Sequence, residues 1–138
     1  MPTWSAPVRY AEVDGQGVVF NSHYLLYCDE AMSAFCRERG LLDLAERVQL
    51  VSSTQTWTSG ARWGDLVEVD VTCERVGTTS FLLAFAVLAN GRACCAVRTT
   101  YVLTEPVDGV WRPAPIPDDM RAALQAQETS LGDVGELA

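Results

Sequence analysis

The chain of 138 residues is 49% hydrophobic and carries ten basic residues against eighteen acidic ones, a net charge of −8. This length predicts a single domain, spanning residues 1–138, with one hydrophobic core. No segment gathers several Lys or Arg, so the sequence excludes the basic footprint that a nucleic acid requires. No run approaches the roughly 18 apolar residues of a membrane span, and the first ten residues lack the features of a signal peptide. We therefore expect a cytoplasmic protein with neither a nucleic acid nor a membrane as partner.

The cysteine pattern bears on redox state and on metals. The five cysteines are odd in number, and no C-x-x-C pair is followed by a second pair. This spacing favours neither a disulfide framework nor a zinc site, so we expect reduced, mostly buried thiols and no metal. Cys94 and Cys95 are adjacent in an alternating segment, so their side chains are expected to point to opposite faces of a strand.

The N-terminal part of the chain predicts a short strand, residues 8–13, and then a helix, residues 22–39. Apolar side chains recur along the helix at steps of three and four residues, the spacing of a buried helical face. The members of this face are Tyr24, Leu25, Tyr27, Cys28, Ala31, Met32, Ala34 and Phe35. Asn21 or Ser22 is expected to cap the start of the helix, and Gly40 to stop it.

The rest of the chain predicts four strands and a short helix. The strand ranges are 48–59, 65–76, 79–89 and 92–104. The second of them alternates valines with mostly acidic residues, so one face of the sheet is expected to be apolar and the other solvated. Asn90-Gly91 joins the last two strands and favours a type I′ hairpin turn. The proline-rich end leads into a helix capped by Asp118 or Asp119, with a frayed tail over residues 129–138.

A long apolar helix followed by strands with tight turns predicts an α+β fold, with the helix packed on one face of a five-stranded antiparallel sheet. Such a sheet has open edges, which natural proteins normally cover. We therefore expect a symmetric dimer in which an edge strand pairs with its own copy.

The order of these elements and the opening stretch together resemble the 4-hydroxybenzoyl-CoA thioesterase-like group of the hotdog superfamily. The matching residues are V-R-Y-A-E-V-D-G-Q-G-V-V-F before the helix, N-S-H-Y-L-L-Y-C-D-E-A at its start, G-D-L-V-E-V after it and W-R-P-A-P-I-P near the end. The resemblance covers residues 8 to about 124. It implies a hotdog fold with the sheet wrapped around the helix, a homodimer or a homotetramer of two dimers, and hydrolysis of acyl-CoA or acyl-carrier-protein thioesters without a metal or other cofactor.

The resemblance also implies a site. In that family the catalytic carboxylate lies in the turn before G-x-V-x, at the dimer interface, and Asp14 occupies the matching position. Many relatives have a histidine at the position of Asn21, whereas the only histidine here is His23. The resemblance therefore points to Asp14, Gly17 and the backbone amide of Asn21 as the catalytic groups.

These residue types suit the chemistry. Thioester hydrolysis needs a nucleophile, or a base that activates water, and positive charge where the carbonyl oxygen becomes an oxyanion. Asp14 can attack directly or deprotonate water, and the sequence leaves both roles open. Amides of the first helical turn, beginning at Asn21, carry a partial positive charge. Gly17 lets the backbone turn sharply and approach a ligand closely, while Glu12 is expected either to be solvated or to support the site.

Substrate contacts are expected beside this turn and in a later one. His23, Tyr24 and Tyr27 are candidates for the first group, and the alternative account of these residues is helix capping or core packing. The phosphates of CoA require local cations, and the V-G-T-T-S turn after Arg75 is the candidate place, with Arg75 and Ser80 as contacts.

Two other functions are compatible with the sequence. Asp followed by Gly is a common turn pair, so Asp14 can simply shape a turn in a non-catalytic acyl-binding or scaffolding dimer. Hotdog dehydratases and hydratases resemble a pattern in which a catalytic histidine is paired with a carboxylate, and His23 lies inside the helix start instead. The sequence does not specify the acyl group.

Overall fold

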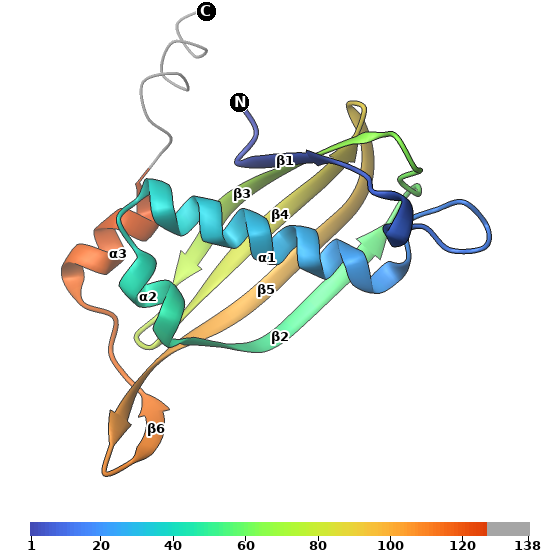
Figure 1. Cartoon of the computed structure of the whole chain (residues 1–138). Coiled ribbons are helices and arrows are strands. Elements are labelled where there is room, and N and C mark those ends of the chain that lie inside the picture. Colours follow the sequence, from blue (N-terminus) through green and yellow to red (C-terminus); the bar gives the residue numbers. More distant parts are fainter. Residues whose placement is uncertain (127–138) are drawn as a thin grey trace, which may run out of the picture.

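The computed structural model describes residues 1–126, and Figure 1 shows a curved sheet that wraps around one long helix. The strands are β1 (Trp4–Pro7), β2 (Val48–Trp57), β3 (Leu66–Val76), β4 (Ser80–Ala89), β5 (Arg92–Val107) and β6 (Val110–Pro113). The helices are α1 (Asn21–Glu38), α2 (Leu42–Arg47) and α3 (Asp118–Gln125), with a 3-10 turn, η1, over Tyr10–Glu12. The predicted α+β hotdog arrangement is confirmed. The predicted frayed tail lies outside the described residues.

The strand order is β1-β3-β4-β5-β2, and every neighbouring pair is antiparallel. This path has five strands, which is the predicted number, and β6 adds a sixth by pairing with the end of β5. Asn90 and Gly91 both have positive φ, 50° and 79°, which confirms the predicted hairpin turn. Asp108 and Gly109 repeat this geometry, with φ of 52° and 78°, and close the hairpin of β5 and β6.

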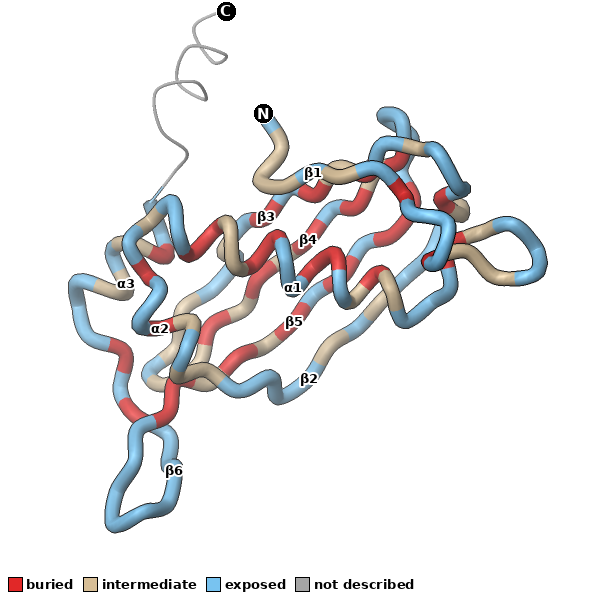
Figure 2. Tube along the Cα trace, viewed as in Figure 1, coloured by how far each residue is buried: buried red, intermediate tan, exposed pale blue. Residues whose placement is uncertain are grey.

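Figure 2 shows that the buried side of α1 faces the buried residues of the sheet. Tyr24, Tyr27, Cys28, Ala31, Met32, Phe35 and Cys36 are the buried residues of this helix, so its predicted apolar face is confirmed. Along β3, Val67, Val69 and Val71 are buried, while the residues between them are partly or fully exposed. Fully burying a side chain such as Phe35 contributes about 1.5–3 kcal/mol, so this face holds α1 on the sheet. Within residues 1–126, no helix combines the length and the apolar character needed to cross a membrane.

The first strand lies earlier than predicted. β1 pairs with β3 before residue 8, and the expected strand over residues 8–13 is wrong because that segment contains η1. Glu12 causes the turn: its amide donates to the Arg9 carbonyl at 2.9 Å, and its Oε1 accepts the Arg9 amide at 2.8 Å. A local charge pair therefore overrides a weak strand pattern.

Both predicted N-caps are wrong, whereas the predicted stop of α1 at Gly40, which has a φ of 69°, is confirmed. The N-cap residue of α1 is Phe20 and that of α3 is Pro117, and within the described residues neither helix start has a capping hydrogen bond from a side chain. Asn21, Ser22, Asp118 and Asp119 lie inside the first helical turns instead. The entry into α1 is fixed by a backbone contact, in which the Phe20 amide donates to the Glu12 carbonyl at 2.9 Å.

Cys94 and Cys95 are both buried, so the prediction that they point to opposite faces is wrong. The register of β4 and β5 pairs Val87 with Cys95 and Leu88 with Ala93, which leaves Cys94 as the extra residue of a β-bulge. A bulge breaks the strict alternation of side chains along a strand. All five cysteines are free thiols.

Candidate active site

Asp14 lies in a closed loop between η1 and α1, the Asp14 loop, which spans residues 13–19. Val13 pairs with Val19, and the Asp14 amide donates to the Val18 carbonyl at 2.8 Å. The Oδ1 atom of Asp14 accepts the Gln16 amide at 2.8 Å, so one carboxylate oxygen stabilises the turn. The Oδ2 atom accepts no hydrogen bond from any of residues 1–126. The same side chain can therefore shape the turn and present one oxygen to a substrate.

Gly17 is required by the conformation of this loop. Its φ of +80° lies in the left-handed region, where side chains other than that of glycine are strained. A Cβ atom at this position would meet nothing within 4 Å, so space around Gly17 is not the constraint within this chain. Its amide donates to the Asp14 carbonyl at 3.0 Å, which places Gly17 in the shape of the turn.

The start of α1 presents free backbone amides. Within the described residues, the amides of Asn21 and Ser22 have no acceptor, and no acidic side chain lies in the first turn. Such amides carry the positive end of the helix dipole. The His23 ring lies edge-on to the Phe20 ring, with centroids 6.5 Å apart, and its buried Nδ1 has no hydrogen-bond partner among residues 1–126. Two backbone amides are thus available to a polar ligand here, whereas the unpaired ring nitrogen of His23 is buried.

Glu12 lies at the base of the Asp14 loop. The sequence predicts Glu12 either to be solvated or to support the site. Only 4% of its surface is exposed, so the solvated position is wrong. Burial by itself would raise the pKa of Glu12, but hydrogen bonds from the Arg9 amide, the Arg9 side chain and the Tyr27 hydroxyl hold this pKa below its ordinary value. Glu12 is therefore an ionised, buried carboxylate.

Tyr24 and Tyr27 lie in the core, with 1% and 4% of their surfaces exposed. The Tyr24 hydroxyl accepts the Ala61 amide at 3.0 Å, and the Tyr27 hydroxyl donates to Glu12 at 2.9 Å. Burial raises the pKa of Tyr24, and burial together with the Glu12 hydrogen bond raises that of Tyr27. Both hydroxyls therefore stay protonated at neutral pH and connect α1 to its two neighbouring loops.

The second of these loops, residues 58–65, forms a wall beside the Asp14 loop. Arg62 pairs with Val18, and the Val19 amide donates to the Ala61 carbonyl at 2.8 Å. The sequence carries no clear signal for this wall because the partners are more than forty positions apart.

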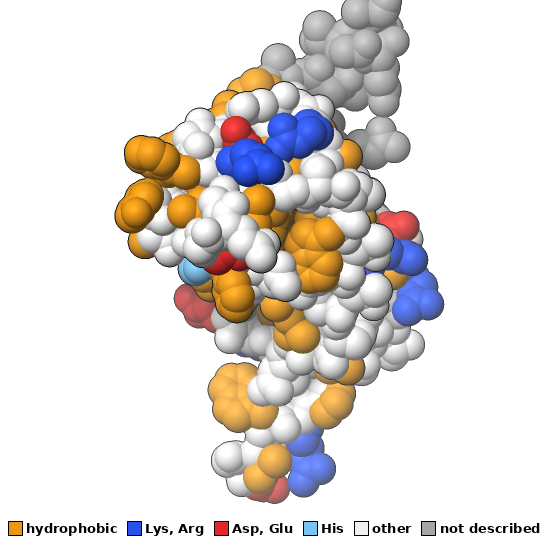
Figure 3. All heavy atoms as spheres, turned by 90° about the vertical axis from the view of Figure 1, so that its right-hand side faces the viewer, with side chains coloured by type: hydrophobic (Ala, Val, Ile, Leu, Met, Phe, Trp, Pro, Cys, Tyr) orange, Lys and Arg blue, Asp and Glu red, His pale blue; other side chains and the backbone are white. Residues whose placement is uncertain are grey.

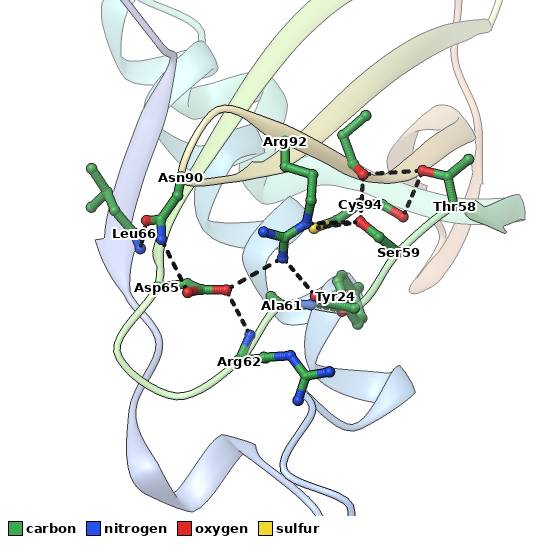
Figure 4. A network of polar contacts seen from close by, with 12 residues as sticks. Tyr24, Thr58, Ser59, Ala61, Arg62, Asp65, Leu66, Asn90, Arg92 and Cys94 are labelled. Atoms are coloured by element: carbon green, nitrogen blue, oxygen red, sulfur yellow. Dashed lines mark hydrogen bonds and ion pairs between the residues drawn. The ribbon is translucent and has the colours of Figure 1, made fainter.

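Figure 4 shows the polar network that orders this wall. Asp65 accepts the Arg62 amide at 2.9 Å and the Asn90 side-chain amide at 3.1 Å, and it pairs with Arg92 at 3.5 Å. Arg92 also donates to the Gly60 carbonyl at 2.8 Å. The wall is therefore tied to the β4–β5 hairpin turn, and the backbone that faces Val18 is held in place.

Figure 3 looks onto the end of the molecule where α1 begins and shows hydrophobic and basic side chains gathered there. Tyr10, Phe20 and Trp63 are three exposed aromatic residues of the segments at this end, with 72%, 52% and 64% of their surfaces accessible. The rings of Tyr10 and Trp63 contact edge to face, with centroids 5.4 Å apart. Exposed apolar surface of this kind is typical of interaction sites.

Arg75 and Ser80 are not brought to Asp14 by this chain. They lie at the β3–β4 turn, where Arg121 of α3 donates to the Val76 carbonyl at 3.3 Å. The 11 residues of β3 span roughly 33 Å at about 3.3 Å per residue, and the wall that contacts the Asp14 loop precedes the opposite end of β3. The predicted contact of Arg75 and Ser80 with CoA phosphates thus stays a prediction, and it requires a second chain if Asp14 is the reagent.

A cavity of about 320 Å³ lies at this far end as well, between the end of α1, β3 and α3, with Arg39, Cys73 and Leu124 in its lining. It is separated from the Asp14 loop by the length of α1, about 27 Å for 18 residues. Among residues 1–126, no three His, Cys, Asp or Glu side chains gather as a metal site.

Comparison with known proteins agrees with this geometry. The family model described as the thioesterase-like superfamily matches residues 8–124. The chain belongs to this superfamily. The predicted family is thereby confirmed, and the matched region contains both the Asp14 loop and α1.

Individual relatives in the superfamily are distant in sequence and close in structure. A putative esterase of Aquifex aeolicus (strain VF5) is 24% identical over 103 residues, which are 71% of this chain and 80% of that protein. A thioesterase of Thermus thermophilus, complexed with coenzyme A and Zn, has a TM-score of 0.79 at 24% identity, covering 88% of this chain and 90% of its own. A 4-hydroxybenzoyl-CoA thioesterase mutant complexed with 4-hydroxybenzoyl-CoA has a TM-score of 0.79 at 15% identity, covering 88% of this chain and 96% of its own.

Proposed function

We propose that this chain is an acyl-CoA thioesterase in which Asp14 is the reagent and the first amides of α1 bind the oxyanion. The observation that carries the proposal is the closed loop that uses one oxygen of Asp14 and leaves the other free, directly before an uncapped helix start. The thioesterases among the structural relatives support the reaction class.

The chemistry requires little beyond these groups. Asp14 either attacks the thioester carbonyl and forms an acyl anhydride, which water then hydrolyses, or takes a proton from the water that attacks. In both routes the carbonyl oxygen becomes negative in the transition state, and the amides of Asn21 and Ser22 can stabilise it. The carbon–sulfur bond breaks, and CoA leaves as the thiolate. The proposal involves no metal and no further cofactor.

We propose that the working form is a homodimer. Among the described strands β2 pairs only with β5, so its outer edge is unpaired, and Leu50, Val51 and Trp57 on it are exposed. Pairing of this edge with a second copy would cover it. Figure 1 shows the Asp14 loop projecting from the body of the chain, a position that suits a site completed by a second subunit.

We propose that the acyl group of the substrate is carried by CoA. The net charge of −8 opposes long-range attraction to an acidic carrier protein. An acyl-carrier-protein substrate is the alternative, and a panel of acyl thioesters that includes both kinds of substrate separates them.

The test is hydrolysis of a panel of acyl thioesters by the wild type and Asp14→Asn. The panel runs from acetyl-CoA to palmitoyl-CoA, with benzoyl-CoA, phenylacetyl-CoA and an acyl carrier protein. Loss of thioester absorbance is followed directly, because the five thiols of the protein would react with a thiol reagent. Asp108→Asn is the matched control, since Asp108 also precedes a glycine in a tight turn and lies in the distant β5–β6 hairpin.

We expect the wild type and Asp108→Asn to turn over at least one member equally, and Asp14→Asn to be slower by about a hundredfold or more. Equal rates for all three proteins would make Asp14 a turn residue. If no member is hydrolysed but acyl-CoA binds, the non-catalytic acyl-binding dimer replaces the proposal. Hydration of an enoyl-CoA in the same assay would favour the dehydratase alternative.

A further inference from the structure

We infer that Glu12 is a positioning residue: its buried carboxylate, bound by Arg9 and Tyr27, fixes the Asp14 loop against the start of α1. The inference rests on the proposed role of Asp14. In this role Glu12 does not itself touch the substrate, but it determines the position of Asp14.

All the polar atoms of Glu12 are hydrogen bonded. Oε1 accepts the Arg9 amide at 2.8 Å and the Tyr27 hydroxyl at 2.9 Å. Oε2 accepts the Arg9 guanidinium through Nη2 at 2.6 Å and through Nε at 3.0 Å. The Glu12 amide donates to the Arg9 carbonyl, and the Glu12 carbonyl accepts the Phe20 amide, both at 2.9 Å. Glu12, the last residue of η1, therefore contacts Arg9 at the start of η1, Tyr27 inside α1 and Phe20, which precedes α1.

These contacts lie at the base of the Asp14 loop. The chain leaves Glu12, closes the loop through the Val13–Val19 pair, and returns at Phe20 to the Glu12 carbonyl. The next residue, Asn21, carries the first proposed oxyanion donor. Through Tyr27, seven residues into α1, the carboxylate also ties this base to the helix. The position of the Asp14 loop relative to the start of α1 is thus set by a single anchor.

The anchor depends on a carboxylate and not only on a side chain of that size. Four donor groups converge on its two oxygens, and an ionised carboxylate accepts from all of them. A glutamine has one accepting oxygen, and its NH₂ group would face donors. The Arg9 side chain is 78% exposed, and the Tyr27 ring packs against the Trp4 ring, with centroids 5.8 Å apart. Arg9 and Tyr27 can therefore keep their positions when Glu12 is replaced.

The test is the kinetics of Glu12→Gln and Tyr27→Phe with the acyl-CoA that the wild type hydrolyses best. A misplacement of about 1 Å can lower a rate by about a hundredfold, so we expect kcat to fall about 10- to 100-fold in Glu12→Gln. Tyr27→Phe removes one of the four donors and is expected to have a smaller effect in the same direction. KM is expected to change by less than about threefold, since ground-state binding does not use the anchor.

Two controls separate positioning from loss of folding. Thr104→Val removes a buried hydrogen bond, from Oγ1 to the Arg47 carbonyl at 2.6 Å, near the other end of α1, and is expected to keep the wild-type kcat. The double variant Asp14→Asn with Glu12→Gln is compared with Asp14→Asn alone. If Glu12 acts through Asp14, the second change adds no further loss. Circular dichroism at the assay temperature measures the folded fraction of each variant.

The outcomes are distinct. Loss of kcat in Glu12→Gln, with no additional loss in the Asp14→Asn background, supports the inference. The same fold-loss in both backgrounds, or a loss matched by the folded fraction, makes Glu12 structural and overturns it. A wild-type kcat in Glu12→Gln also overturns it while leaving the role of Asp14 intact. If Asp14→Asn itself is fully active, the proposed function fails, and the inference fails with it.

Discussion

Tyr24→Phe removes one oxygen atom that holds the wall beside the candidate site. The Tyr24 hydroxyl accepts the amide of Ala61, and neither residue has more than 1% of its surface exposed. The phenylalanine ring keeps its packing, because the contacts of the Tyr24 ring with Tyr27 and Trp57, both at 6.0 Å, do not use the hydroxyl. The substitution therefore isolates one buried hydrogen bond.

The expected cost follows from the amide that is left behind. A buried donor without a partner costs about 1–3 kcal/mol, against a total stability of about 5–15 kcal/mol for a domain of this kind. At a urea dependence near 2 kcal/mol per M, the unfolding midpoint should fall by about 0.5–1.5 M. The pKa of Tyr24 is raised by burial, so its neutral form is the stabilising one. The Ala61 hydrogen bond by itself lowers this pKa, because an ionised oxygen still accepts the Ala61 amide, so the comparison is made at pH 7, where the hydroxyl is neutral.

The assay is equilibrium unfolding in urea at pH 7 and a fixed chain concentration, followed by circular dichroism. Tyr10→Phe is the matched control, because Tyr10 is 72% exposed and its hydroxyl bonds to no described residue. Its midpoint should stay at the wild-type value. Equal midpoints for Tyr24→Phe and Tyr10→Phe would refute the reasoning, since they would show that the Ala61 amide finds another acceptor at no cost.

Three further predictions concern charge, thiols and metals. The pKa of Glu12 lies below its ordinary value of 4.5, so its stabilising effect is present above pH 4.5 and is lost as the pH falls through the folded-state pKa. Urea unfolding should show Glu12→Gln less stable than the wild type at pH 7, with the difference shrinking below pH 4.5. Burial raises the pKa of Cys28 to about 12 and that of Cys36 to about 11, whereas Cys73 is only half-buried. A thiol reagent at pH 8 should modify Cys73 first, and Cys73→Ser should remove the fastest phase; an unchanged fast phase would contradict this order. Dialysis against EDTA should leave kcat unchanged, and a loss that added metal restores would refute the metal-free proposal.

The elements predicted best are those whose signal is local and repeated. The sequence predicts α1 over residues 22–39 and β3 over residues 65–76, and both begin and end within one residue of those limits. Repeated burial at helical or strand spacing defines such elements because the side-chain directions of the two structures differ. β6 also has a local signal, the Asp108-Gly109 turn, which the prediction does not use. The short helix α2 has too few residues to show a period.

The elements predicted poorly depend on partners that a sequence does not display. The Arg9–Glu12 pair turns the chain into η1, and the bulge at Cys94 depends on how β5 aligns with β4. For the candidate site, the motif predicts the Asp14 loop, but it cannot show that residues 58–65 form the neighbouring wall. Nor can it show that Arg75 lies at the far end of β3, because that distance depends on the antiparallel path of the sheet.

The free oxygen of Asp14 is the proposed reagent. The most direct measurement is the single-turnover rate of thioester loss, with enzyme in excess over the best acyl-CoA, for the wild type, Asp14→Asn and Asp108→Asn. All three should have the same circular dichroism spectrum and the same oligomeric state. We expect Asp108→Asn to match the wild type and Asp14→Asn to be slower by about a hundredfold or more. A folded Asp14→Asn protein that cleaves the thioester at the wild-type rate would contradict it.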